Sequence, residues 1–301
     1  MSTITRPRAV QRAPRQLTSR RSAGVNVRSS PLATALLLVG ALYCLLPLIW
    51  VVMAASKNGT ELFTTNTFVP SSHLWDNIVA LSTYRGGIYW KWMLNTVLYA
   101  GVGALLSTVV SALAGYALAK YEFRGKSAIF TVLLAGVLVP GVILAVPQYF
   151  LLAEFNLTNS YWAVLLPQIV SPYGIYLARI YSAASVPNEI IEAGRTDGAP
   201  EFYIFRRIAV PMMVPGLVTI FLFQFVGIWN NFILPYIMLG DDGLYPITVG
   251  LSGLLNQGST VPALYTLVIA GSMLSIVPLV FLFLGLQRFW KVDLGAGAVK
   301  A

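Results

Sequence analysis

Long apolar runs separated by shorter polar segments fill most of this 301-residue chain. A helix needs roughly 17–25 apolar residues to span a bilayer, and in lipid only helices or closed barrels satisfy the backbone. The pattern predicts an all-α membrane protein with transmembrane helices at 32–55, 93–119, 128–152, 161–178, 211–239 and 262–286. Residues 32–286 then form a six-span membrane domain, between a polar segment at 1–31 and a tail at 287–301.

Residue types inside the spans predict how the helices pack. The second span is rich in small residues, which allow close helix approach in lipid: Gly101, Gly103, Ala104, Ser107, Ser111, Ala114 and Gly115. Prolines interrupt the third span at Pro140-Gly141 and Pro147, and the fourth at Pro167 and Pro172. Broken helices are tolerated in membranes where they pack on protein or line a cavity, so we expect one of these environments at each break.

The segments outside the spans carry two further patterns. Aromatic residues gather around the start of the second span, which is typical of a belt at the membrane interface: Tyr84, Tyr89, Trp90 and Trp92. Residues 240–261 contain two aspartates and a run of Gly, Asn, Gln and Ser. This second segment is predicted to be a loop.

Basic residues are distributed unevenly between the two predicted sides of the membrane. Seventeen of the 20 Lys and Arg residues fall in segments 1–31, 120–126, 179–207 and 287–301. The opposite side has only Lys57, Arg85 and Lys91. Such an excess is the positive-inside pattern, so both termini and the segment between spans four and five are predicted to be cytoplasmic. The Arg-rich N-terminal segment is then a disordered tail or an arm that binds anionic lipid.

The composition excludes several classes of protein. The chain is 57% hydrophobic and 10% charged, whereas soluble domains carry about 25% charged residues. Its one cysteine, Cys44, and one histidine, His73, give no disulfide, no metal site and no catalytic triad. Gly125-Lys126-Ser127 resembles the end of a phosphate-binding loop, but Lys120 stands where that loop needs glycine. We therefore expect no enzyme, no cofactor and no metal on this chain, and no nucleic-acid partner because its basic residues lack a clustered face.

The six predicted spans contain no Asp, Glu, Lys, Arg or His. Ion-coupled transporters usually place ionisable groups within the membrane, so the chain is not expected to power transport by itself. Amides hydrogen-bond hydroxyl groups and aromatic rings offer apolar faces, so we take as candidates for lining a pathway Gln148, Tyr173, Gln224, Trp229, Asn230 and Asn231. The alternative is that these amides bond neighbouring helices.

Residues 188–215 form an amphipathic stretch between the fourth and fifth spans. Four of the eleven acidic residues lie there, and apolar residues alternate with the charges at roughly helical spacing. Asp197-Gly198 is a turn signal, so the stretch predicts two short helices around a tight corner. An apolar face at this place docks on lipid or on another protein.

This stretch resembles the cytoplasmic loop of bacterial ABC-importer permease subunits, with its pattern E-A-A-x-x-D-G-A. The matching residues are Glu192, Ala193, Gly194, Asp197, Gly198 and Ala199, followed by Phe205, Ile208, Pro211 and Pro215. Gly194 replaces the usual second alanine, and Pro200 stands where a polar helix cap is common, so it is expected to start the second helix. The resemblance implies a coupling helix, within about residues 185–210, that docks on a cytoplasmic ATPase through Glu192, Ala193, Gly194, Asp197, Gly198, Ala199 and Phe205.

Two further segments resemble the maltose-type carbohydrate branch of these permeases, and within it the second, shorter subunit. They are Trp229-Asn230-Asn231-Phe232 with Leu234-Pro235, and Leu286-Gln287-Arg288-Phe289 with Gly297-Ala298-Val299-Lys300. The resemblance implies a multi-pass subunit of a bacterial cytoplasmic-membrane sugar importer. Its partners would be a second permease, two ATPases that bind ATP and Mg²⁺, an extracytoplasmic solute-binding protein and membrane lipids. The alternatives are a permease for another neutral or zwitterionic solute, and an ATP-independent channel or scaffold.

Overall fold

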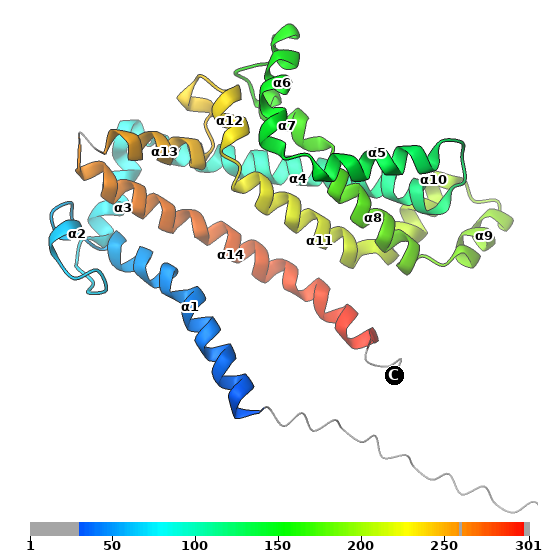
Figure 1. Cartoon of the computed structure of the whole chain (residues 1–301), viewed down its shortest axis with the longest axis horizontal. Coiled ribbons are helices and arrows are strands. Elements are labelled where there is room, and N and C mark those ends of the chain that lie inside the picture. The colour runs from blue at the N-terminus through cyan, green and yellow to red at the C-terminus, as the bar shows by residue number, and fades with distance from the viewer. Residues whose placement is uncertain (1–29, 259–260, 298–301) are drawn as a thin grey trace, which may run out of the picture. The chain divides into compact units, whose positions relative to one another are not determined.

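The computed structural model describes residues 30–258 and 261–297. Its helices (Figure 1) are α1 (Pro31–Ala55), α2 (Glu61–Thr64), α3 (Leu74–Thr83), η1 (Tyr84–Gly86), α4 (Ile88–Lys120), α5 (Lys126–Leu138), α6 (Gly141–Glu154), α7 (Tyr161–Ile169), α8 (Pro172–Ser185), α9 (Asn188–Thr196), α10 (Glu201–Ile204), η2 (Phe205–Ala209), α11 (Val210–Trp229), α12 (Ile233–Met238), η3 (Asp242–Leu244), α13 (Ile247–Gln257) and α14 (Ala263–Gly297). The described residues contain no strand, and the predicted all-α membrane fold is confirmed. The predicted N-terminal tail lies outside them except for its last two residues.

The chain divides after Leu46 into two units, and the contacts described below lie within the second. Five helical stretches of the described chain are long and apolar enough to cross a membrane: Pro31–Ala55, Ile88–Lys120, Tyr161–Ser185, Glu201–Trp229 and Ala263–Phe289. The sixth candidate is the pair α5 and α6, which bends by 106° at the predicted Pro140-Gly141 break. The 13 residues of α5 extend only about 20 Å, less than the roughly 30 Å hydrocarbon core.

The predicted fifth span and the predicted loop after it differ from the structure. The fifth span ends at Trp229 rather than at 239, and after a short break α12 follows as a separate helix. The segment 240–261 is not a loop throughout, because it contains the eleven-residue helix α13. Ile247, Leu251 and Leu254 of that helix are buried against α3, α4 and α14.

Helix α4 packs along α7, α8 and α11. Ser107 and Ser111 are completely buried, and a Cβ at Gly115 would lie 2.6 Å from the backbone nitrogen of Arg179. The prediction that small residues bring this helix close to its neighbours is therefore confirmed at these positions. It does not extend to Gly101, where a Cβ would meet no atom within 4 Å.

The predicted aromatic belt before the second span is wrong for two of its members. Tyr89 and Trp92 are 0% and 2% exposed, and only Trp90, at 48%, is open. The Tyr89 hydroxyl donates to the carbonyl of Gly271 at 2.9 Å, and Trp92 packs against α13 at Gly250. These aromatic side chains anchor α13 and α14 to α4 instead of facing the interface.

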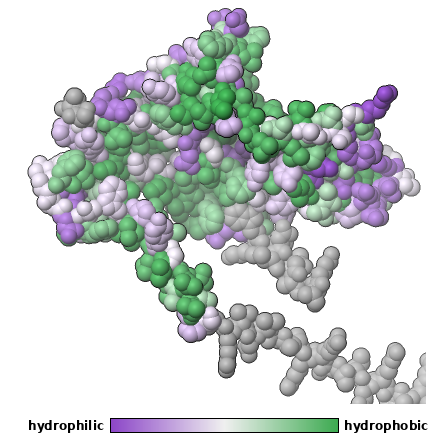
Figure 2. Space-filling model, viewed as in Figure 1, coloured by the Kyte–Doolittle hydropathy of each residue, from purple (hydrophilic) through white to green (hydrophobic). Residues whose placement is uncertain are grey.

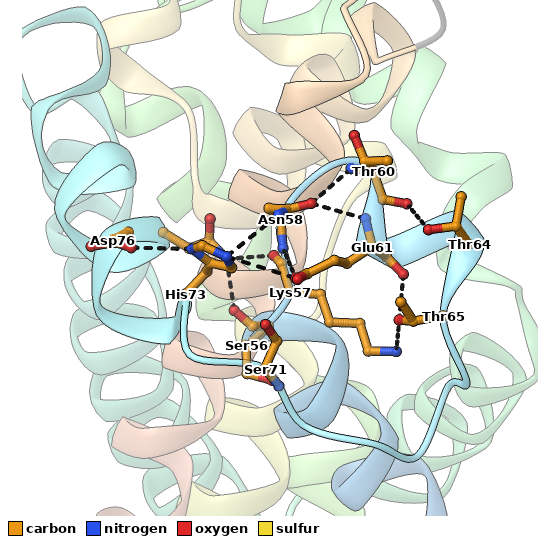
Figure 3. Close-up of polar contacts among 12 residues, drawn as sticks. Ser56, Lys57, Asn58, Thr60, Glu61, Thr64, Thr65, Ser71, His73 and Asp76 are labelled. Atoms are coloured by element: carbon orange, nitrogen blue, oxygen red, sulfur yellow. Dashed lines mark hydrogen bonds and ion pairs between the residues drawn. The ribbon is translucent and has the colours of Figure 1, made fainter.

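The polar segment after α1, on the predicted outer side, is held by its own hydrogen bonds (Figure 3). Lys57 is only 1% exposed, and its Nζ donates to Thr65 Oγ1 at 2.9 Å and to the carbonyl of Asn66. The backbone N–H of Asn58 donates to Glu61 Oε2 at 3.1 Å, and this bond is the main cause of a lowered pKa at Glu61. Local polar contacts therefore order the segment.

Candidate functional site: the α9–α10 corner and the polar cavities

The corner between α9 and α10 is closed by backbone hydrogen bonds. Gly198 has a positive φ of 76°, a conformation in which residues with a Cβ are strained. The N–H of Asp197 donates to the carbonyl of Ala193 at 2.9 Å, and the N–H of Ala199 to that of Gly194 at 3.0 Å. The second helix begins just after Pro200. The turn predicted from Asp197-Gly198 and the short helix before it are confirmed. The second helix is not a separate short one as predicted, because α10 continues through η2 into α11 as a single helical stretch, Glu201–Trp229.

The inner face of the corner belongs to a buried apolar cluster. Ile191 of α9 and Ile204 of α10 lie in it, together with Tyr116, Val186, Ala209 and Met213. A Cβ at Gly194 would lie 3.3 Å from Ile204 Cδ1, so this glycine lets α9 approach α10 closely. Because Tyr116 is on α4 and Met213 on α11, the cluster joins the corner to two long helices.

Polar contacts hold the same corner from its edges. Arg195 Nε lies 2.6 Å from Glu201 Oε1, and its terminal amino group lies 3.3 Å from Glu201 Oε2. The hydrogen bond to Glu201 raises the pKa of Arg195. The hydroxyl of Tyr121 also donates to Glu201 Oε2, at 2.7 Å. At the start of α9, Lys120 Nζ donates to Asn188 Oδ1 at 3.0 Å, so the end of α4 is tied to the corner.

The outer face of the corner is open. Hydrophilic residues gather at the end of the molecule formed by α9 and α10 (Figure 2). Glu192, Ala193, Asp197 and Gly198 are exposed, and no atom comes within 4 Å of the Cβ position at Gly198. The seven residues assigned to coupling thus separate: these four face outward, and Gly194, Ala199 and Phe205 contribute to the packing beneath them.

The predicted pathway residues do not gather at one place. Asn231 lines a cavity of about 320 Å³, whereas Trp229 and Asn230 line another of about 370 Å³. Trp229 is 2% exposed and stacks on Phe225, with ring centroids 5.5 Å apart, so it is a packing residue. Tyr173 is 44% exposed and lies edge-on to Phe223, 6.2 Å between centroids.

The two remaining candidates lie elsewhere. The amide of Gln224 packs beside Gly174, and Gln148 lies half-buried on α6, outside both cavities.

Three helix breaks meet at the 320 Å³ cavity. Its wall contains Gly141 from the α5–α6 break, Gln168 next to the α7–α8 break, and Asn231 from the α11–α12 break. Gln168 Nε2 is buried and has no hydrogen-bond partner. In the sequence Gln168 is one of several amides in the spans, and the pattern does not distinguish it from the others. Gln168 lines the cavity while this donor is buried beside it, and an unpaired amide donor next to a cavity suits a ligand that supplies a hydrogen-bond acceptor when the side chain turns toward it.

Comparison with known proteins agrees with the membrane fold described above. Residues 107–290 match the family of binding-protein-dependent transport system inner membrane components. The chain belongs to this family. Membership confirms the predicted multi-pass permease of the ABC-importer type, a transport component.

Members of the family with curated descriptions align along nearly the whole chain. The arabinooligosaccharides transport system permease protein AraQ of Halalkalibacterium halodurans is 35% identical, over 91% of this chain and 99% of that protein. The lactose transport system permease protein LacG of Rhizobium radiobacter is 30% identical, over 84% and 90%. The crystal structure of a bacterial ABC transporter involved in the import of the acidic polysaccharide alginate matches in fold, with a TM-score of 0.73, 20% identity and coverage of 85% and 94%.

Proposed function

We propose that this chain is a permease subunit of an ATP-driven importer of sugars or oligosaccharides. It forms half of the translocation pathway together with a second, homologous permease. Two cytoplasmic ATPases bind ATP and Mg²⁺ and supply the drive, and an extracytoplasmic binding protein delivers the solute. Family membership and the sugar substrates named for two relatives support the proposal.

The observation that carries the proposal is the two-faced α9–α10 corner. Its outer face presents Glu192, Ala193, Asp197 and Gly198, and its inner face is built into the cluster of Tyr116, Ile204 and Met213. A subunit that docks on the outer face therefore moves α4 and α11 when it moves the corner. Packed interfaces transmit such displacements because they are not continuously deformable. The corner is a rigid joint between an ATPase and the membrane helices.

A charge reversal at the docking surface tests the joint. In the Glu192→Lys variant we expect uptake to fall at least about thirtyfold at equal expression, because an unpaired charge at an interface costs about 2 kcal/mol or more. Glu192 is exposed and its carboxylate makes no hydrogen bond or ion pair in the described part of the chain, so membrane insertion and the melting temperature of the purified protein should not change. Normal uptake by this variant would contradict the docking assignment.

Gln168 tests the pathway. Replacing it with leucine removes a buried amide nitrogen that has no partner, and an unsatisfied buried donor costs about 1–3 kcal/mol. We expect Gln168→Leu to melt at a temperature equal to or higher than the unchanged protein. The KM for uptake should rise about threefold to tenfold, because one hydrogen bond to solute is lost. An unchanged KM would show that the amide does not contact solute.

Two measurements discriminate the alternatives. Solute-binding assays on the cognate extracytoplasmic protein separate sugars from other neutral or zwitterionic solutes. Uptake measured after ATP depletion separates the importer from an ATP-independent channel, for which flux would persist. The proposed importer requires that flux stop and that an ATPase co-purify.

A further inference from the structure

A further cavity, of about 580 Å³, lies between α8 and the hairpin with the first residues of α5. Arg179 lines it from α8. The sequence pattern places the end of the fourth span at 178, but the helix continues through Arg179 to Ser185. Arg179 therefore lies on α8 itself, near the end of the helix that the charge distribution places at the cytoplasmic side.

Aromatic stacking holds the guanidinium group in place. Arg179 Cζ lies 3.8 Å from the centroid of the Phe130 ring, and Phe130 stacks on Tyr176 with centroids 6.3 Å apart. Arg179 Nε donates to the carbonyl of Leu118 at 3.4 Å, and its terminal amino groups have no acceptor among the described residues. A guanidinium fixed in this way presents two parallel N–H groups, a geometry that matches phosphate oxygens.

The charge of Arg179 is not balanced within the cavity. Glu122 is the one carboxylate in the wall, and it is paired with Lys126 at 2.8 Å. Lys126 Nζ also donates to the carbonyl of Tyr121, at 3.0 Å. The wall thus carries one excess positive charge, on Arg179, beside a second cation. This arrangement favours an anionic ligand.

An apolar strip leads away from the cavity along α5. Phe130 lines the cavity, and Leu134 and Leu138 follow it at four-residue spacing, 38% and 83% exposed. Residues four apart share a helix face, and α5 has no buried residue. A ligand that fits both features has an anionic head and a long apolar chain. The charge distribution along the sequence places this end of α5 at the cytoplasmic leaflet.

We propose that the cavity binds the phosphate of an anionic phospholipid of the cytoplasmic leaflet, with an acyl chain along α5. Basic pockets between transmembrane helices on the cytoplasmic side are suited to such head groups. Arg179 and Lys126 hold the phosphate, and Phe130 forms the floor. Only Val186 and Pro187 separate α8 from α9, so the lipid steadies the helix that leads into the corner. The site does not depend on which solute is carried.

The test measures lipid binding by native mass spectrometry on the transporter purified in detergent with its accompanying subunits and stripped of lipid. The probes are phosphatidylglycerol, diacylglycerol with the same chains, and inorganic phosphate as a competitor. We expect Arg179→Gln to raise the apparent Kd for phosphatidylglycerol about tenfold, because a charge-assisted pair is lost. Arg124, exposed on the same hairpin and outside the cavity wall, supplies the control: Arg124→Gln should change the Kd less than about twofold.

Arg179→Lys keeps the positive charge but loses the two parallel N–H groups of the guanidinium. This variant replaces Arg179→Gln in the binding measurement if Arg179→Gln does not fold. We expect it to raise the Kd about threefold. Three results would overturn the proposal: equal affinity in the wild-type and Arg179 variants, equal binding of diacylglycerol, or displacement of the lipid by inorganic phosphate, which would assign the site to a soluble anion. Failure of phosphatidylglycerol to bind because an accompanying subunit covers the cavity would likewise reject it.

Discussion

Replacing Gly198 with aspartate is expected to lower solute uptake at least about thirtyfold, since disturbing the centre of an interface costs about 2 kcal/mol or more. Gly198 has a φ of 76° and open space around it. The new carboxylate stands next to Asp197 on the surface proposed to face the ATPase. It adds both bulk and like charge there. Uptake in cells and ATPase co-purification, at equal membrane expression, are the measurements.

Gly86 provides the matched control for backbone strain. Its φ is 70°, and its Cβ position also has no neighbour within 4 Å. Aspartate is among the residues that best tolerate the left-handed conformation, so the strain is similar in the two variants. Gly86→Asp should change uptake less than about twofold. Equal losses in both variants would mean that strain, and not docking, explains the effect at Gly198.

The second large effect concerns the contact between α4 and α8. A methyl group at Gly115 would lie 2.5 Å from Ala178 Cβ and 2.6 Å from the backbone nitrogen of Arg179. Backbone atoms cannot turn aside as a flexible side chain does, so the helices must separate. We expect Gly115→Ala to lower the free energy of unfolding by about 1–3 kcal/mol and the Tm of the detergent-purified protein by roughly 5 °C.

Gly101 lies on the same helix and tests the same substitution without a contact. Its Cβ position has no neighbour within 4 Å. Alanine is the better helix former by about 0.5–1 kcal/mol, so Gly101→Ala should leave the Tm unchanged or raise it. If both variants lost stability alike, close packing of α4 on α8 would not be the cause.

Local sequence signals predicted the turn of the α9–α10 corner, and its inner face only in part. Asp197-Gly198 is a turn signal that depends only on neighbouring residues. The apolar spacing predicts an inner face of Ile190, Ile191, Ala193, Phe202, Phe205 and Ile208. Of these, Ile191, Phe205 and Ile208 belong to or pack against the buried cluster. Phe202 and Ile190 are 65% and 38% exposed and Ala193 is exposed, whereas the buried Ile204 was not predicted. Which protein the outer face meets is a matter of resemblance and proposal, because spacing alone does not distinguish lipid from a protein groove.

Helix α13 was not predicted because residues in it that look like loop residues are there to fit against α4, which is far away in the sequence. Gly250 looks like a loop residue, yet a Cβ there would lie 2.2 Å from the ring of Trp92. The N–H of Ile247 at the start of the helix donates to the Thr96 hydroxyl at 2.7 Å. Both partners are on α4, about 150 residues earlier. The spacing of neighbouring residues cannot predict contacts between segments so far apart in the sequence. The same contact buries Trp92, which the sequence pattern placed in an aromatic belt at the membrane interface.

The 320 Å³ cavity lined by Gln168 and Asn231 also could not be predicted from the sequence, because it forms between segments that are far apart along the chain. Prolines and glycines predicted breaks in the third and fourth spans, and the resemblance drew attention to Asn231. Only the fold brings these breaks together and leaves Gln168 Nε2 without a partner. Spacing along the chain ranks all span amides equally. The candidates Trp229 and Gln148 were therefore as plausible from sequence as Asn231, although the structure places them in a packed core and outside the cavity.

Site-specific cross-linking at Ala193 tests the central claim most directly. Cys44 is the one native cysteine, so a Cys44→Ala background allows a single thiol to be placed by Ala193→Cys, with Phe155→Cys, 66% exposed and distant in the sequence, as the control. A thiol-attached photo-cross-linker at 193 should capture an ATPase subunit, with a yield that changes when ATP is added, and the linker at 155 should not. Capture of lipid alone at 193, or equal capture at both positions, would contradict the account.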